Sequence, residues 1–217
     1  MYLAVDEQPI NILEQEGDRT TCHEKWESFP YSQLLHHGEA CCDVAREWLL
    51  AMDFAQLNGG DLWSGPRWMR QKYEWGPSAW PLHWCEVVGR KSIDCGVHAA
   101  IAHEAFLARG VTAFRAQFVQ RYNPEAISQW RLKWGEEQVS VHWLEDDFIY
   151  HEGNALLVGE DEVKLWDASA GWWINPRQMG GYGSLAAVRV FGEGRREPVR
   201  WGEHLIMLDE WYLVQSD

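Results

Sequence analysis

Hydrophobic residues recur at helical spacing in two stretches of the first half of the chain. Between residues 39 and 57, apolar side chains return every three or four positions, and Asn58-Gly59-Gly60 ends the pattern. Residues 94–109 form the clearer helix, with Asp94 as the predicted N-cap and Gly110 as the predicted C-cap. Its interior is rich in alanine, so this helix is expected to lie close to whatever it packs against.

After Gly110 the pattern changes from a helical period to that of a strand. Val139, Val141 and Trp143 alternate with polar residues, which is typical of a half-buried strand. The predicted strands span residues 112–121, 138–144, 148–158, 162–167, 186–191 and 204–214. Because short turns join several of them, an antiparallel meander is expected. A helical front half followed by a sheet predicts the α+β class.

The 217 residues are expected to form a single domain. Its core is predicted at about residues 80–215, after a helical or irregular part over residues 1–79. Residues 59–84 form a long connection that Gly-Pro and Trp-Pro pairs interrupt. Connections of this length inside a compact domain are usually functional, for example as lids.

Tryptophan is unusually frequent in this long connection. The chain has 15 tryptophans, and Trp63, Trp68, Trp75, Trp80 and Trp84 all fall within it. Since indole is large and its N–H needs a partner, part of this stretch is expected to form a groove wall. The net charge of −14 disfavours nucleic acid as a partner and weakly favours cationic amines.

The remaining composition predicts a cytoplasmic protein without a metal or cofactor. An odd number of cysteines, five, without a leader-like N-terminus indicates reduced thiols. No apolar run reaches the roughly 18–20 residues of a membrane span, so no membrane partner is expected. His37 and Cys41 lie four residues apart, but no second pair has zinc-ligand spacing.

Cys95 is the predicted nucleophile, because it directly follows the predicted N-cap of the clearest helix. The N–H groups and the dipole of a helix N-terminus stabilise an anion, which would lower the pKa of the thiol and could receive a developing oxyanion. A second, side-chain donor to the oxyanion is expected upstream of the cysteine. Gln71, Trp80 and Trp84 are the candidates for this donor or for the substrate groove.

His151 and Asp167 are the predicted base and its orienting carboxylate. They lie 16 residues apart on two predicted strands, around a plausible turn at Gly159-Glu160-Asp161. A hairpin centred near residue 159 would place them directly opposite each other, and a shift by one residue would make them diagonal on the same face. His142 is the alternative base, although a simple hairpin would not pair it with Asp167. His98, one helical turn after Cys95, is expected to be a packing or solvent-facing histidine.

Two motifs resemble those of transglutaminase-like cysteine enzymes. Ile93-Asp94-Cys95-Gly96-Val97-His98-Ala99 is similar to their nucleophile motif, and Leu165-Trp166-Asp167-Ala168-Ser169-Ala170-Gly171 resembles their strand-end aspartate motif. The order Cys, His, Asp and the spacings of 56 and 16 residues also look similar, as they do for the related arylamine N-acetyltransferases. After the histidine, this chain has Glu152 and Gly153 where the family usually has a small residue and tryptophan.

The resemblance implies a papain-like core, with the cysteine helix packed on an antiparallel sheet, and a thioester intermediate at Cys95. The expected activity is acyl transfer from a peptide, an amide or a carrier thioester, with an amine as the expected acceptor. A thiol hydrolase of the same fold, acting as a peptidase, amidase or deamidase, is the alternative. A catalytically silent binding module that uses the tryptophan-rich segment is the alternative of another class.

Overall fold

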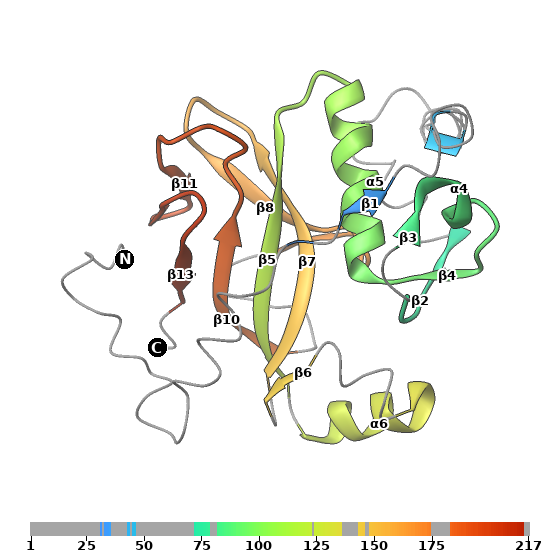
Figure 1. The fold of residues 1–217 in the computed structure, drawn as a ribbon. Coiled ribbons are helices and arrows are strands. Elements are labelled where there is room, and N and C mark those ends of the chain that lie inside the picture. Colours follow the sequence, from blue (N-terminus) through green and yellow to red (C-terminus); the bar gives the residue numbers. More distant parts are fainter. Residues whose placement is uncertain are drawn as a thin grey trace.

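The computed structural model describes residues 31, 33–35, 43, 45–46, 72–78, 82–122, 124–135, 143–145, 148–174 and 183–214. Within these residues the protein is α+β, as the sequence predicts: one large antiparallel sheet carries a helix on one face (Figure 1). The sheet has seven strands: β5 (Ala113–Tyr122), β6 (Trp143–Glu145), β7 (Phe148–Leu157), β8 (Val163–Asp167), β9 (Trp172–Ile174), β10 (Gly183–Val190) and β13 (Trp211–Leu213).

The strand order along the sheet is β13-β10-β5-β7-β8-β9, and β6 pairs with the beginning of β7. The strands predicted at residues 112–121, 148–158, 162–167 and 186–191 are confirmed. The expected antiparallel meander is confirmed for β6, β7, β8 and β9, which pair in sequence order. It is wrong for β10, which crosses back to pair with β5 instead of following β9. Of the strand predicted at residues 138–144, only residues 143 and 144 are described, and they belong to β6.

The predicted strand at residues 204–214 is also wrong as a single element. It consists of β12 (His204–Ile206) and β13, separated by a turn in which Asp209 has a φ of 65°. This left-handed conformation cannot continue a strand. β12 pairs instead with β11 (Val199–Trp201). This hairpin packs on one face of the large sheet, in a cluster that includes Phe118 and Leu165.

The predicted helix at residues 94–109 is confirmed as α5 (Cys95–Ala108). Asp94 caps its first turn, and Gly110 ends it with a φ of 73°. The N–H of Gly110 donates to the carbonyl of Leu107 at 2.9 Å, which satisfies one of the last carbonyls of the helix. Most of α5 is buried, and its alanines allow close packing against β7 and β5.

A small layer covers the side of α5 that faces away from the sheet (Figure 1). It contains β1 (Leu34–Leu35), β2 (Glu74–Trp75), β3 (Leu82–His83), α4 (Trp84–Val87) and β4 (Ser92–Ile93). Their apolar side chains share one core cluster with α5 and with residues of the large sheet. The helix predicted at residues 39–57 is described only at residues 43, 45 and 46, which are helical.

A further helix, α6 (Pro124–Trp134), connects β5 to β6 and was not expected from the hydrophobic pattern. Two of its residues anchor it: Ile127 packs on Ile149 of β7, and the ring of Trp130 lies 5.3 Å from the ring of Trp75. α6 therefore packs against both the beginning of β7 and β2, the strand that pairs with β4.

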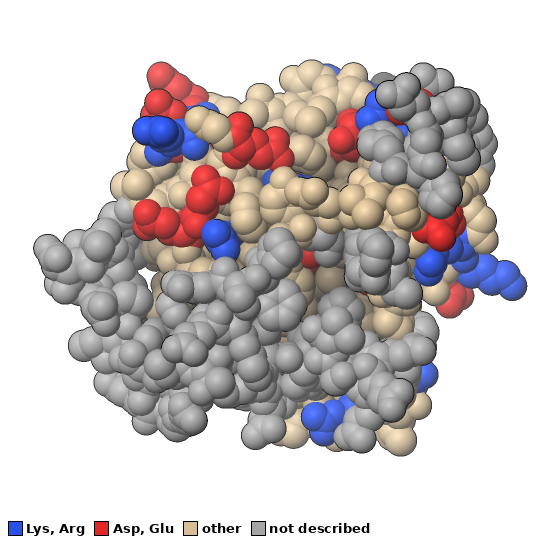
Figure 2. All heavy atoms as spheres, in the orientation of Figure 1, with Lys and Arg blue, Asp and Glu red and all other residues tan. Residues whose placement is uncertain are grey.

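On the face shown in Figure 2, acidic and basic side chains of the described residues are interspersed, and no large basic patch is formed among them. None of the described helices is both long and apolar enough to span a membrane.

Candidate active site

The position of Cys95 is fixed by the segment that leads into α5. β4 pairs in parallel with β2, and the next residue, Asp94, donates its N–H to the hydroxyl of Ser78 at 3.2 Å. The carboxylate of Asp94 accepts the N–H of Val97 at 2.9 Å, as an N-cap does. Cys95 therefore occupies the first position of the helix, with its side chain only 2% exposed.

His151 and Asp167 meet across the β7–β8 hairpin. The observed register pairs Leu157 with Val163 and Asn154 with Trp166, so the hairpin is centred on residue 160 rather than 159. His151 is therefore diagonal to Asp167 on the same face, and the expectation of direct opposition is wrong by one residue. The diagonal arrangement still brings Nε2 of His151 to 2.9 Å from Oδ2 of Asp167.

Gly153 allows β7 and β8 to approach each other closely. A Cβ atom on Gly153 would lie 2.7 Å from the ring of Phe118 and even closer to the carbonyl oxygen of Trp166. The backbone of Trp166, the residue before Asp167, thus lies against Gly153, where β7 has no side chain. Any larger residue at position 153 would push β8 away from β7.

The carboxylate of Asp167 is held by its own turn as well as by His151. Its Oδ1 accepts a hydrogen bond from the hydroxyl of Ser169 at 2.8 Å and one from the N–H of Ala170 at 2.9 Å. With one oxygen bound by the turn and the other by His151, the carboxylate can adopt only a narrow range of orientations. Ser169 also lies 3.5 Å from Nε2 of His151.

The side chains of Cys95 and His151 form a hydrogen bond, which completes a chain of contacts from thiol to imidazole to carboxylate. Because Asp167 occupies Nε2 of the imidazole, Nδ1 is the nitrogen left to face the thiol. The structure thus brings together all three residues that the sequence singled out: Cys95, His151 and Asp167.

Burial and charge act in opposite directions on these three groups. Burial raises the pKa of the Cys95 thiol, and the charge and hydrogen bond of His151 reduce this effect without reversing it. The expected lowering of the thiol pKa is therefore wrong for this enclosed arrangement. Burial disfavours the His151 imidazolium, but Asp167 and Cys95 outweigh burial and raise its pKa well above 6.5. Burial disfavours the Asp167 carboxylate, but His151 outweighs burial and lowers its pKa.

The structure describes only one of the three residues predicted as oxyanion donors or groove residues. Gln71 and Trp80 lie outside the described residues. Trp84 is 4% exposed and packs in the core beneath α5, which favours a structural role over a groove. In the described part of the chain, the backbone N–H groups of Cys95 and Gly96 are left without an acceptor, since the cap of Asp94 serves Val97 and His98. These two groups are available to a bound anion.

Of the other two histidines near the predicted site, the structure describes only His98. His142, the alternative base, lies outside the described residues. His98 is fully buried, so it is not solvent-facing, and neither ring nitrogen has a hydrogen-bond partner among the described residues. Burial, opposed by the charge of Asp167, lowers the pKa of His98 to about 4. At neutral pH His98 is uncharged and does not compete with His151 for protons.

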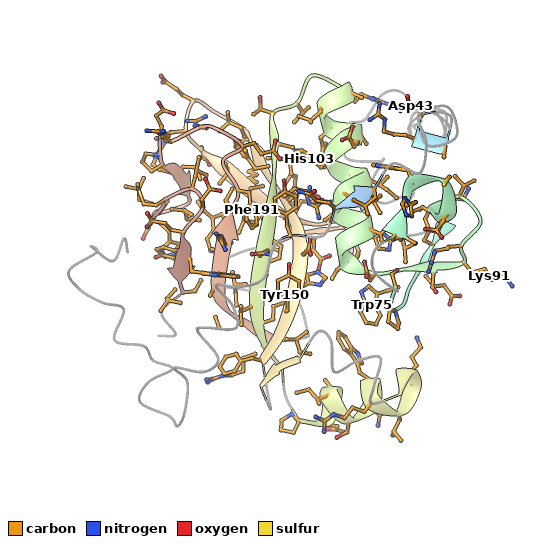
Figure 3. All side chains as sticks on the ribbon, in the orientation of Figure 1. Asp43, Trp75, Lys91, His103, Tyr150 and Phe191 are labelled. Carbon is orange, nitrogen blue, oxygen red and sulfur yellow. The ribbon has the colours of Figure 1, made fainter. Side chains whose placement is uncertain are left out.

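Trp75 is the described member of the tryptophan-rich segment that lies beside the site. It pairs in register with Ile93, two residues before Cys95, and contacts Trp130 of α6. Trp75 and Tyr150 both lie close to the beginning of α5 (Figure 3).

A group of buried polar residues next to Cys95 was not singled out from the sequence. It consists of Arg115 and Gln117 on β5 and of Tyr150 and Glu152 on β7. A signal was available: Arg115 and Gln117, like Tyr150 and Glu152, lie two positions apart, so each pair faces one side of its strand. Recognising it requires the register of β5 against β7, which the sequence pattern alone does not define.

A scan against protein-family models, a search of curated proteins and a search of solved structures each found no match. Among the described residues, no group of three or more His, Cys, Asp or Glu side chains could hold a metal ion.

Proposed function

We propose that this protein is a cysteine-dependent acyl-transfer enzyme that forms a thioester at Cys95. One observation carries the proposal: the continuous contact from the Cys95 thiol through His151 to Asp167, in which Nε2 of His151 lies 2.9 Å from the carboxylate. A nucleophile, a base and a carboxylate that orients the base are the elements of covalent acyl transfer. Structural cysteines do not require such an arrangement.

The chemistry would proceed in two halves. In the form of the Cys95–His151 pair that has lost one proton, His151 takes the thiol proton, and the sulfur attacks the carbonyl carbon of the acyl donor, forming a C–S bond and an oxyanion. The N–H groups of Cys95 and Gly96 would stabilise the oxyanion. When the intermediate collapses, the bond to the leaving group breaks and His151 returns its proton to that group. The second half reverses these steps with an amine or a water molecule, which releases the thioester.

The fold is consistent with a transglutaminase-like, papain-like core, which forms part of the proposal. In such a core the helix that begins at the cysteine packs on an antiparallel sheet whose neighbouring strands carry the histidine and the aspartate. α5, β7 and β8 have this relation. The α+β arrangement by itself does not define the chemistry, which depends on the three side chains.

The coupled protonation of Cys95 and His151 predicts the form of the pH dependence. Both pKa values are raised, so the doubly protonated pair, a thiol beside an imidazolium, persists to higher pH than it would for the free side chains. Attack requires that the pair lose one proton, an event that belongs to the pair rather than to either residue. Activity should therefore rise with pH along a single limb, and replacing Asp167 should move that limb to lower pH.

An amine is the proposed acyl acceptor. The proposed acyl donor is a peptide, an amide or a carrier thioester. Two features support the amine: the net charge of −14, which attracts cations, and the aromatic pair of Trp75 and Trp130 beside the cysteine helix. We also propose that the protein acts in the cytoplasm, where its thiols would stay reduced.

The test is capture of the acyl-enzyme. Incubation with activated esters and thioesters should add one acyl group, located at Cys95 by peptide mass spectrometry. Cys85→Ser, which removes a half-buried thiol outside the site, should retain the adduct, whereas Cys95→Ser should lose thioester formation. Absence of any adduct at Cys95, with the thiol intact, would instead support a silent binding module.

Partitioning of the trapped acyl-enzyme then separates transfer from hydrolysis. A decay rate that increases and saturates with one class of amine supports an acceptor site. A decay rate that is independent of amine identity and concentration would make the protein a hydrolase. Trp75→Ala should weaken the saturation by the amine if the aromatic pair contributes to that site.

A further inference from the structure

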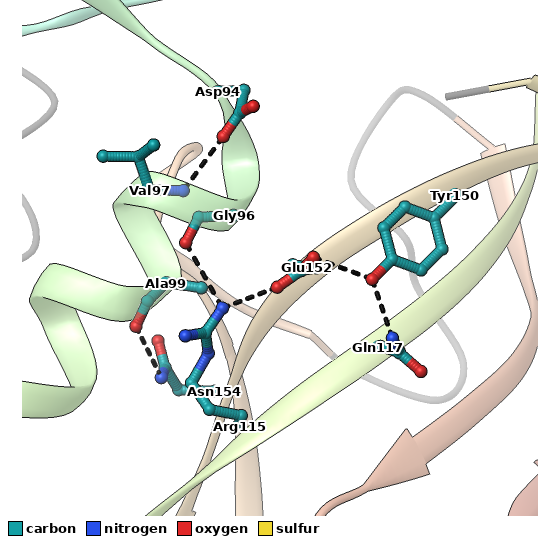
Figure 4. A network of polar contacts seen from close by, with 9 residues as sticks. All are labelled: Asp94, Gly96, Val97, Ala99, Arg115, Gln117, Tyr150, Glu152 and Asn154. Carbon is teal, nitrogen blue, oxygen red and sulfur yellow. Dashed lines mark hydrogen bonds and ion pairs between the residues drawn. The ribbon is translucent and has the colours of Figure 1, made fainter. Parts of the chain in front are cut away.

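Four polar side chains form a buried chain of contacts that reaches Gly96, the residue after Cys95 (Figure 4). The guanidinium of Arg115 donates to the carboxylate of Glu152 at 2.5 Å. The hydroxyl of Tyr150 donates to the other oxygen of Glu152 at 2.7 Å, and the side-chain amide of Gln117 donates to that hydroxyl at 2.8 Å. All four residues are nearly inaccessible to solvent.

This group is connected to the first turn of α5 as well as to the sheet. Nη2 of Arg115, the nitrogen that contacts Glu152, also donates to the carbonyl of Gly96 at 3.3 Å. Gly96 directly follows Cys95. One turn further along, the side-chain amide of Asn154 donates to the carbonyl of Ala99 at 3.0 Å. Two side chains of the sheet thus hold two successive turns of the helix by their carbonyl groups.

Stability alone does not explain a buried ion pair at this position. Removing two charges from water costs several kcal/mol per ion, and apolar residues of similar volume often stabilise a core equally well or better. The ion pair does, however, make directional hydrogen bonds to specific groups, which apolar residues cannot do. It joins β5, β7 and the residue after the nucleophile, and its carboxylate lies close enough to Cys95 to affect the thiol electrostatically.

We propose that Arg115 and Glu152 are positioning residues for Cys95: Arg115 fixes the first turn of α5 through Gly96, and Glu152, held by Arg115 and Tyr150, keeps a negative charge near the thiol. The proposal rests on the proposed role of Cys95 as nucleophile. Tyr150 and Gln117 complete the arrangement by holding the second oxygen of Glu152. The enclosed thiol is thereby kept oriented toward His151 and protected from premature ionisation.

Two substitutions with opposite electrostatic consequences test the proposal. Glu152→Gln retains the shape of the side chain but removes its charge, so Cys95 should ionise more readily and its titration midpoint should move to lower pH. Arg115→Met retains an apolar stem but leaves Glu152 unneutralised, so the midpoint should move to higher pH. A shift of one pKa unit corresponds to about a tenfold change in the thiolate population.

The measurement is the thiolate absorbance near 240 nm, titrated in each variant and corrected by subtraction of the same variant carrying Cys95→Ala. This readout needs neither an acyl donor nor access of a reagent to the buried thiol. Asp161→Asn is the matched control, because it breaks the exposed ion pair with Arg200 on the far hairpin and should leave the midpoint unchanged.

Opposite shifts in the two variants, with the control unchanged, would support the positioning role. Shifts in the same direction, or no shift in Glu152→Gln, would overturn it and leave a purely structural ion pair. The proposed function fails separately, through the absence of any acyl-enzyme in the unmodified protein. Unfolding midpoints of all variants, measured in parallel, identify a variant that has lost its fold. If Arg115→Met does so, Arg115→Gln provides the second variant, with the same expected direction.

Discussion

The charge state of His151 is set by its two neighbours, Asp167 and Cys95. Both raise its pKa against the effect of burial, and the carboxylate makes the larger contribution. Because Ser169 and Ala170 fix the other oxygen of Asp167, the carboxylate cannot turn away from the imidazole. The orientation of the base is therefore a property of the turn that follows β8.

Replacing Asp167 with Asn should lower the pKa of His151, because it removes the opposite charge that stabilises the imidazolium. Turnover of any substrate should fall by up to about 10⁴-fold, because the amide no longer holds the imidazole in the correct tautomer and orientation. The imidazole titration can be followed by NMR. Ser169→Ala is the control, since it removes one bond to the carboxylate but keeps the charge, and it should shift the titration much less. An unchanged titration in Asp167→Asn would contradict the contact.

Gly153 should tolerate no side chain. Gly153→Ala places a methyl group against the ring of Phe118 and the backbone of β8, and overpacking of this kind typically costs about 1–3 kcal/mol. Gly159→Ala is the matched control, because its Cβ would meet only Glu162, at 3.5 Å. Denaturant unfolding should show a loss of stability for the first substitution and little change for the second. Equal effects would indicate that the close approach of β7 and β8 is not required.

At the scale of elements, local capping residues determine where α5 begins and ends, and tertiary packing determines which of its residues are buried. The cap at Asp94 and the glycine at its end were readable from the sequence, because both act on neighbouring backbone groups. α6 has local signals too: Pro124 begins it and Glu125 lies in its first turn. Its apolar residues Ile127, Trp130 and Trp134 also recur at helical spacing, so the local signal for this helix was present in the sequence. Contacts with Ile149 and Trp75 anchor it to the rest of the protein.

The cap of α5 can be tested through its two functions. Asp94→Ala should cost about 1 kcal/mol of stability, the usual value for a lost N-cap. Asp94→Asn retains the capping oxygen and should cost less. Both remove a negative charge that raises the pKa of Cys95, so both should make the thiol ionise at lower pH. Denaturant unfolding and the thiolate absorbance separate these effects. A similar loss of stability in both variants would show that the cap is not the cause.

At the scale of the whole molecule, the interaction between Asp167 and His151 makes stability depend on pH. Asp167 has a lowered pKa, so its stabilising contribution is present above 3.8 and is lost as the pH falls through its folded value. His151 has a raised pKa, so its contribution is present below 6.5 and is lost as the pH rises through its folded value. The pair therefore stabilises the fold most between these two ordinary values.

His98 should add a separate loss of stability in acid. Its folded pKa of about 4 lies below its ordinary 6.5, so the unfolded chain binds a proton between these values that the folded protein does not. The fold should lose about 3 kcal/mol from this group between pH 6.5 and 4. Denaturant unfolding at pH 7 and pH 4.5 should show a smaller loss for His98→Phe than for the unmodified protein. Identical losses would mean that His98 is not enclosed in its uncharged form.

The sequence by itself determined the features that depend on nearby residues. The helix that begins at Cys95 follows from its caps, and the pairing of His151 with Asp167 follows from the strands on both sides of one short turn. Even there, the sequence left the hairpin centre uncertain by one residue, because a strand pattern with a period of two does not define where a turn is centred.

Only the tertiary structure decided how these pieces meet. The contact between Cys95 and His151, the return of β10 to β5 and the contact of Arg115 with Gly96 join residues far apart in the chain. Burial also reversed the expected direction for the thiol pKa, because desolvation in an enclosed site outweighs the charge and hydrogen bond of His151. Local patterns carry no information about solvent exclusion, which arises when the sheet, α5 and the layer beyond it pack together.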